Sequence, residues 1–136
     1  MDYQVDLDPT HRVIRLTVTT ETVTLELAED MLRFLSLVAF RGGPYASIID
    51  LSRVTSCTVS GDAVRDFALR PTVPEGTHVT VAREPSVFGL ARMFQLIRDF
   101  IGEQYQVVHS LEEAYHIIGV RPEDFTQHLF PKDLAA

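Results

Sequence analysis

The first residues of the chain alternate between apolar and polar side chains, which is the period of a β-strand with one buried face. This alternation covers residues 3–7 and, less strictly, residues 13–18. Between the two segments lies Asp8-Pro9-Thr10-His11, with Asp and Pro at the first two positions of a type I turn. The pattern predicts an antiparallel hairpin at the start of the chain.

After residue 24 the spacing of the apolar residues changes to three and four, which is typical of an amphipathic helix. Thr22 or Thr24 is the expected cap of this first helix, and Arg41-Gly42-Gly43-Pro44 is expected to end it. The stripe consists of Leu25, Ala28, Leu32, Leu35 and Ala39.

Residues 46–51 form a short apolar run, typical of a strand covered on both faces in a parallel sheet. A polar loop follows, and Ser60 is expected to cap a second helix that ends at Arg70, before Pro71. Because ligands of open α/β sheets usually bind beyond the carboxyl ends of the strands, we expect the functional surface in this loop.

The rest of the chain repeats the alternation of strand and helix. Residues 77–82 and 105–108 read as strands, and a third helix is expected to begin at Pro85. Ser110 opens a capping box for a fourth helix that Gly119 ends. The stripe of the third helix consists of Leu90, Phe94, Ile97 and Ile101.

The order of these elements predicts an α/β fold with a mostly parallel, mixed sheet and about four helices, in the order ββαβαβαβα. The first strand is expected to lie antiparallel at or near an edge. The 136 residues suit one domain, with a tail from about residue 121 and one further turn near residues 124–129.

Composition narrows the function. The net charge of −7 argues against nucleic acid as a partner, because such binding depends on clustered Lys and Arg. The start of the chain is unlike a signal peptide, and the longest apolar stretch, near residues 35–40, is too short for a membrane span. A single cysteine, Cys57, excludes a disulfide within the chain. We therefore expect a cytoplasmic protein.

Two runs of sequence carry a resemblance to a known family. Ile48-Ile49-Asp50-Leu51-Ser52, followed by Thr58-Val59-Ser60-Gly61, resembles the STAS fold of bacterial anti-sigma-factor antagonists, the SpoIIAA-like group. The resemblance places the family's acidic residue at Thr58 and its phosphorylated serine at Val59. Because Val59 has no hydroxyl group, the resemblance implies a regulatory module without the family's phosphoserine switch.

The second run is Val87-Phe88-Gly89-Leu90-Ala91-Arg92-Met93-Phe94, with Leu111–Tyr115 and Ile118-Gly119 after it. It is similar to small stand-alone bacterial proteins labelled STAS or SEC14-like, and the likeness spans roughly residues 3–120. Together the resemblances imply a non-enzymatic, cytoplasmic module that regulates through protein contacts with an unidentified partner. The partner-binding residues implied are Cys57, Thr58, Val59, Ser60, Gly61 and Arg65.

The residues that could carry chemistry each have a structural alternative. Thr58 or Ser60 could receive phosphate, or Ser60 could simply cap the second helix. Cys57 could be a reactive thiol or a small buried apolar residue. No histidine stands at the spacing of a known metal motif, so we expect neither a metal nor another cofactor. We also expect no catalytic set, because the paired acidic residues fall at helix starts or exposed turns.

The third helix has more large apolar residues than one narrow stripe can hold. Phe88, Arg92, Met93 and Phe94 are the residues concerned. Three interpretations stay open: plain burial in the core, a homodimer surface, or a pocket for a small apolar, lipid-like ligand between this helix and the sheet.

Overall fold

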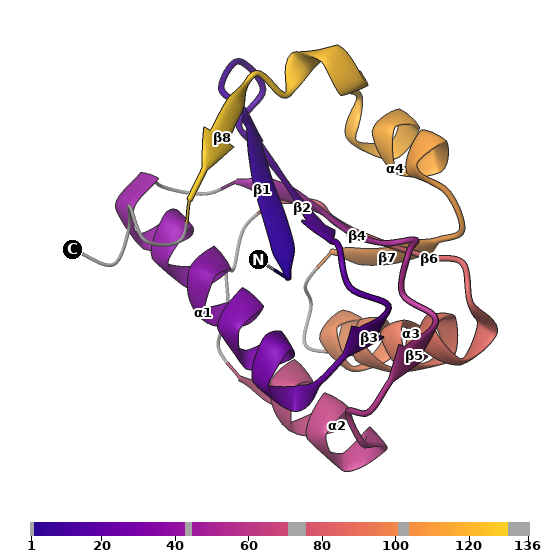
Figure 1. Ribbon diagram of the computed structural model, residues 1–136. Coiled ribbons are helices and arrows are strands. Elements are labelled where there is room, and N and C mark those ends of the chain that lie inside the picture. The colour runs from indigo at the N-terminus through magenta and orange to yellow at the C-terminus, as the bar shows by residue number, and fades with distance from the viewer. Residues whose placement is uncertain (1, 43–44, 71–75, 101–103, 131–136) are drawn as a thin grey trace.

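The computed structural model describes residues 2–42, 45–70, 76–100 and 104–130 of the chain (Figure 1). It has an α/β fold built on a mixed six-stranded sheet in the order β7-β6-β4-β2-β1-β8. The predicted positions Gly43-Pro44, Pro71 and Ile101 and the last residues of the tail lie outside the described residues. The strands of this sheet are β1 (Tyr3–Asp8), β2 (Val13–Val18), β4 (Ala46–Leu51), β6 (His78–Ala82), β7 (Tyr105–Val108) and β8 (Gln127–Leu129).

The predicted hairpin is formed by β1 and β2, which pair antiparallel from Tyr3 opposite Val18 to Asp8 opposite Val13. Strands β2, β4, β6 and β7 are parallel to one another. Strand β8 pairs antiparallel with β1 and forms the edge, so β1 lies one strand in from that edge. The turn predicted near residues 124–129 is wrong in its position: a 3-10 helix lies at Pro122–Asp124, and Gln127–Leu129 form strand β8, which was not predicted.

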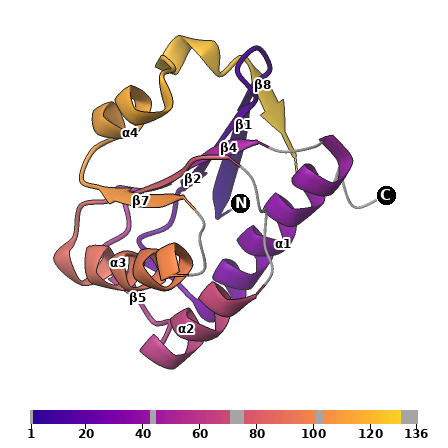
Figure 2. The ribbon, with the colours of Figure 1, turned by 180° about the vertical axis from the view of Figure 1, so that it is seen from behind.

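The helices cover both faces of the sheet unequally. Helices α1 (Leu25–Gly42), α2 (Gly61–Leu69) and α3 (Pro85–Phe100) lie on one face, and α4 (Leu111–Ile118) lies on the other (Figures 1 and 2). Two separate apolar clusters follow from this arrangement. A covered sheet with apolar residues on both faces is what the near-continuous apolar run of β4 predicted.

Local side-chain chemistry sets the helix ends where the sequence predicted them. The Oγ atom of Ser60 accepts a hydrogen bond from the N–H of Ala63, and that of Ser110 accepts one from the N–H of Glu113. Of the two threonines proposed for α1, Thr24 is the one that caps, with Oγ1 accepting from the N–H of Leu27 at 3.2 Å. Gly119 follows α4 with φ +85°, the left-handed conformation that glycine adopts without strain.

The polar loop after β4 is fastened to the start of α1. Strand β5 (Ser56–Cys57) pairs in parallel with β3 (Thr22–Val23) in a separate two-stranded sheet. The N–H of Thr58 also donates to the carbonyl oxygen of Val23 at 2.9 Å. These contacts hold the loop next to the first residues of α1 and α2.

Candidate functional site

A pocket of about 200 Å³ lies between the sheet and the three helices α1, α2 and α3. Strands β2, β4, β6 and β7 form its floor, and Cys57 and Val59 contribute to its lining at the carboxyl end of β4. The side chains that line it are predominantly apolar. Those from the helices are Ala28, Met31, Leu32, Leu35, Val64, Phe67, Val87, Leu90, Ala91 and Phe94.

The pocket leaves the middle of the sheet incompletely covered. Ile49 and Thr80 are opposite each other at the centre of β4 and β6, yet each is only half-buried. Their neighbours on the other face, Ile48 and Val79, are 0% exposed. Protein interiors are normally packed to the density of organic crystals. Because the other face of the same strands is fully covered, the exposure of Ile49 and Thr80 indicates unfilled volume on the pocket side.

Small side chains on the helices help to create this volume. Ala28 of α1 and Ala91 of α3 both line the pocket, and both keep some exposure. On the opposite face, Ala114 of α4 is 0% exposed and packs in the second apolar cluster. The same residue type therefore borders a space on one side of the sheet and a filled core on the other.

One end of the pocket is polar. Ser47 and His78 are paired across β4 and β6, and their Oγ and Nδ1 atoms share a hydrogen bond of 2.6 Å. His78 also stacks on Tyr105 of β7, with 4.8 Å between the ring centroids. Thr80 lies two residues after His78 on the same face of β6, and all four residues line the pocket. Ser47, His78 and Tyr105 lie near the amino ends of their strands. The sequence predicted the functional loop at the opposite, carboxyl ends of the strands.

The residues predicted on the third helix separate into different environments. Phe94 lines the pocket and meets Tyr105 edge-on, with 5.4 Å between centroids. Phe88 stacks on His109, and Arg92 donates a hydrogen bond to Gln95. Met93 and Phe88 are absent from the pocket lining, so among the four predicted residues Phe94 alone belongs to it.

The implied partner-binding residues also divide. Val59 is buried and Cys57 half-buried, and both point into the pocket. Thr58, Ser60, Gly61 and Arg65 are exposed. A surface groove between the start of α2 and α3 is lined by Ser60, Gly61, Asp62, Arg65, Met93 and Ile97.

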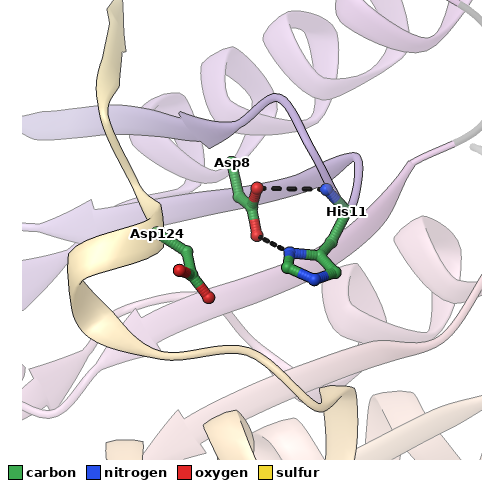
Figure 3. Close-up of side chains that lie close together, drawn as sticks. All are labelled: Asp8, His11 and Asp124. Atoms are coloured by element: carbon green, nitrogen blue, oxygen red, sulfur yellow. Dashed lines mark hydrogen bonds and ion pairs between the residues drawn. The ribbon is translucent and has the colours of Figure 1, made fainter.

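Asp8, His11 and Asp124 bring three groups with metal-binding atoms within 4.8 Å of one another (Figure 3). Each carboxylate already has protein donors. Asp8 accepts from the backbone N–H groups of Thr10 and His11 and meets the His11 ring at 2.6 Å, and Asp124 accepts from the N–H of Arg121. Burial would raise the pKa of Asp8, but these hydrogen bonds outweigh it and lower the pKa. The hydrogen bonds of the cluster stay within the hairpin turn, around Asp8, and within the C-terminal segment, around Asp124.

Comparison with protein-family models, with curated proteins and with solved structures finds no match to this chain. The STAS-like character therefore stays a prediction. Among the described residues, no helix combines the length and apolar character that crossing a bilayer requires.

Proposed function

We propose that this protein binds a small, mainly apolar molecule in the pocket between the sheet and helices α1, α2 and α3. The observation that carries the proposal is the half-buried centre of the sheet, at Ile49 and Thr80, facing about 200 Å³ of space. Sites for small molecules are typically concave, mostly apolar and provided with a few polar groups, and this pocket has that composition.

The size of the pocket limits the ligand. An apolar protein cavity of roughly 150 Å³ holds one benzene molecule, so this pocket suits a compact ligand of about eight non-hydrogen atoms. A long acyl chain would require the helices to move apart.

The proposal is tested by a double substitution that fills the space, Ala28→Leu with Ala91→Leu. Ligand-free wild-type protein is titrated with p-xylene, which has the expected size, and its unfolding is measured in urea. Saturation at 100 times the Kd stabilises the native state by about 2.7 kcal/mol. We expect this gain in wild type and its loss in the double variant.

The matched control is Leu96→Ala, on α3 but 54% exposed and outside the pocket lining, which should keep the gain. Native mass spectrometry of the freshly purified protein is expected to show a co-purifying small molecule. No stabilisation by p-xylene and no co-purifying mass would contradict the proposal.

A second candidate function is the STAS-like interaction module, and the groove at the start of α2 favours it. The groove contains Ser60, Gly61 and Arg65 from the implied partner-binding set. A Cβ atom at Gly61 would meet Met93 at an ordinary 3.6 Å, so Gly61→Trp should project into the groove without disturbing the fold.

Affinity capture from the native host compares wild type with Gly61→Trp. Gly89→Trp is the control, since nothing lies within 4 Å of a Cβ atom there. Loss of the same partner with Gly61→Trp alone supports the module, and identical captured proteins contradict it. The predicted homodimer is tested by light scattering, where a monomer mass would contradict it.

A further inference from the structure

The pocket floor has a compact polar row in an otherwise apolar setting. Ser47, His78 and Thr80 lie side by side on β4 and β6, and the next residue of β4 on the pocket face is Ile49. Parallel strands buried on both faces are usually near-continuous apolar runs. Three polar side chains on one face are therefore a departure that needs a physical reason.

The hydroxyl groups of this row retain hydrogen-bonding capacity. Ser47 Oγ is engaged with His78 Nδ1, and a hydroxyl offers one donor and two acceptor sites, so Ser47 keeps at least one site in either tautomer of the imidazole. Among the described residues, the Thr80 hydroxyl makes no hydrogen bond. Because Thr80 is half-buried, its hydroxyl faces the pocket and can exchange a hydrogen bond with water for one with a ligand group.

Charge limits the kind of group that fits. None of the described lining residues is Asp, Glu, Lys or Arg. Three arginines stand behind rings of the lining: Arg12 over Tyr45 at 4.5 Å, Arg70 over Phe67 at 4.7 Å and Arg98 over Tyr105 at 5.3 Å. A carboxylate in the pocket would thus lose its hydration without a lining counter-charge, which is costly.

We propose that the ligand is an uncharged molecule with one hydrogen-bonding group, of the hydroxyl type, which meets Thr80 and Ser47 while its apolar body lies toward Ile49 and Phe94. This inference rests on the proposed function and specifies the chemical class of its ligand. The polar row then recognises the head of the ligand and the apolar walls its body.

The test uses p-cresol and p-xylene, which have the same shape and differ by a hydroxyl in place of a methyl group. Dissociation constants are measured by NMR titration for wild type and for Thr80→Val, an isosteric change that removes the hydroxyl and breaks no hydrogen bond among the described residues. Thr17→Val is the matched control, because Thr17 is on β2, which pairs in parallel with β4, and does not line the pocket.

In wild type we expect p-cresol to bind at least as tightly as p-xylene, although the phenol hydroxyl must leave water. Thr80→Val should weaken p-cresol relative to p-xylene by about fivefold, the effect of one hydrogen bond, and Thr17→Val should leave the ratio unchanged. Ser47→Ala should act in the same direction as Thr80→Val. Benzoate should not bind.

The outcomes separate this inference from the function on which it rests. Binding of p-xylene that is tighter than p-cresol, with a ratio unaffected by Thr80→Val, would leave the pocket as a binding site and overturn the polar-head assignment. Tighter binding of benzoate than of p-cresol would overturn the uncharged class. Binding of none of the three probes would overturn both the function and the inference.

Discussion

Substituting leucine for alanine at two positions distinguishes an unfilled pocket from a packed core. Ala91 borders the pocket on one face of the sheet, and Ala114 is 0% exposed in the filled cluster on the other. Both residues lie within helices, so the change in helix propensity is the same at both positions and small. The difference between the variants then reports on the space that each side chain enters.

The magnitude follows from the added side chain. Leucine adds three carbon groups, and each buried CH₂ group contributes about 0.8 kcal/mol, which sums to about 2.4 kcal/mol. Ordering the leucine side chain costs about 0.5–1 kcal/mol. We therefore expect Ala91→Leu to stabilise ligand-free protein by about 1.5 kcal/mol, near the upper part of the range for cavity-filling substitutions.

At Ala114 the same three carbon groups have no space. Overpacking a filled core costs about 1–3 kcal/mol, because neighbouring side chains leave their preferred rotamers or the backbone shifts. The two variants should accordingly differ by about 3 kcal/mol, with opposite signs relative to wild type.

Urea denaturation followed by circular dichroism measures both variants, and the midpoint and slope are fitted separately. A thermal scan should show a rise of about 5 °C for Ala91→Leu. Destabilisation of Ala91→Leu to the same extent as Ala114→Leu would show that the space is filled in solution, and the ligand-binding proposal would lose its basis.

Three further predictions concern residues outside the pocket. Burial and a 2.8 Å hydrogen bond to Asp30 raise the pKa of Tyr3, so its contribution to stability is complete below pH 10 and is lost as the pH rises above 10. Denaturation curves measured from pH 9 to 11 should therefore show a smaller loss of stability for Tyr3→Phe than for wild type. Equal losses in the two proteins would contradict this prediction. Hydrogen bonds from the turn outweigh burial and lower the pKa of Asp8, so stability should fall as the pH drops through the folded-state pKa, below about 4. In Asp8→Asn this fall in stability at acid pH should be smaller, and the substitution should cost about 1–2 kcal/mol at pH 7. An unchanged dependence on pH below 4 would contradict this prediction. Gly76 has φ +108°, and a Cβ atom there would lie 2.8 Å from a backbone carbonyl oxygen, so Gly76→Ala should lower the free energy of unfolding by more than about 1 kcal/mol. Gly89 lies in open space on α3, so Gly89→Ala should raise the free energy of unfolding by about 0.5–1 kcal/mol. Similar effects of the two substitutions in urea denaturation would contradict this prediction.

The fold class could be predicted because short stretches of sequence mark where most of its helices begin and end. Ser60 and Ser110 are helix caps, Gly119 ends α4, and Pro85 is the first residue of α3, all as the sequence indicated. Each of these signals depends on a few neighbouring residues. The α/β class follows from the alternation of such elements.

The short strands could not be predicted in the same way. Strand β8 has three residues and β5 has two, too few for a period of two to be recognised. Both exist because a partner strand offers its free backbone groups, as β1 does for β8 around Asp6 opposite His128. Such pairing is a property of the folded chain and not of the segment.

The sequence left a pocket between α3 and the sheet as one of three interpretations and did not indicate its polar part. The structure has a pocket there, and among Phe88, Arg92, Met93 and Phe94 only Phe94 lines it. Ser47, His78 and Thr80 were missed because each looks ordinary in its own strand. The register that sets Ser47 opposite His78 was needed to bring them together, although the i, i+2 spacing of His78 and Thr80 inside a buried strand was a usable signal.

The most direct test of the central claim is a crystal structure of the protein soaked with p-cresol. The account predicts electron density for one p-cresol molecule between Ile49 and Phe94, with its hydroxyl group within hydrogen-bonding distance of Thr80. A structure in which the helices close onto the sheet, leaving Ile49 fully buried and no density for the ligand, would contradict the account.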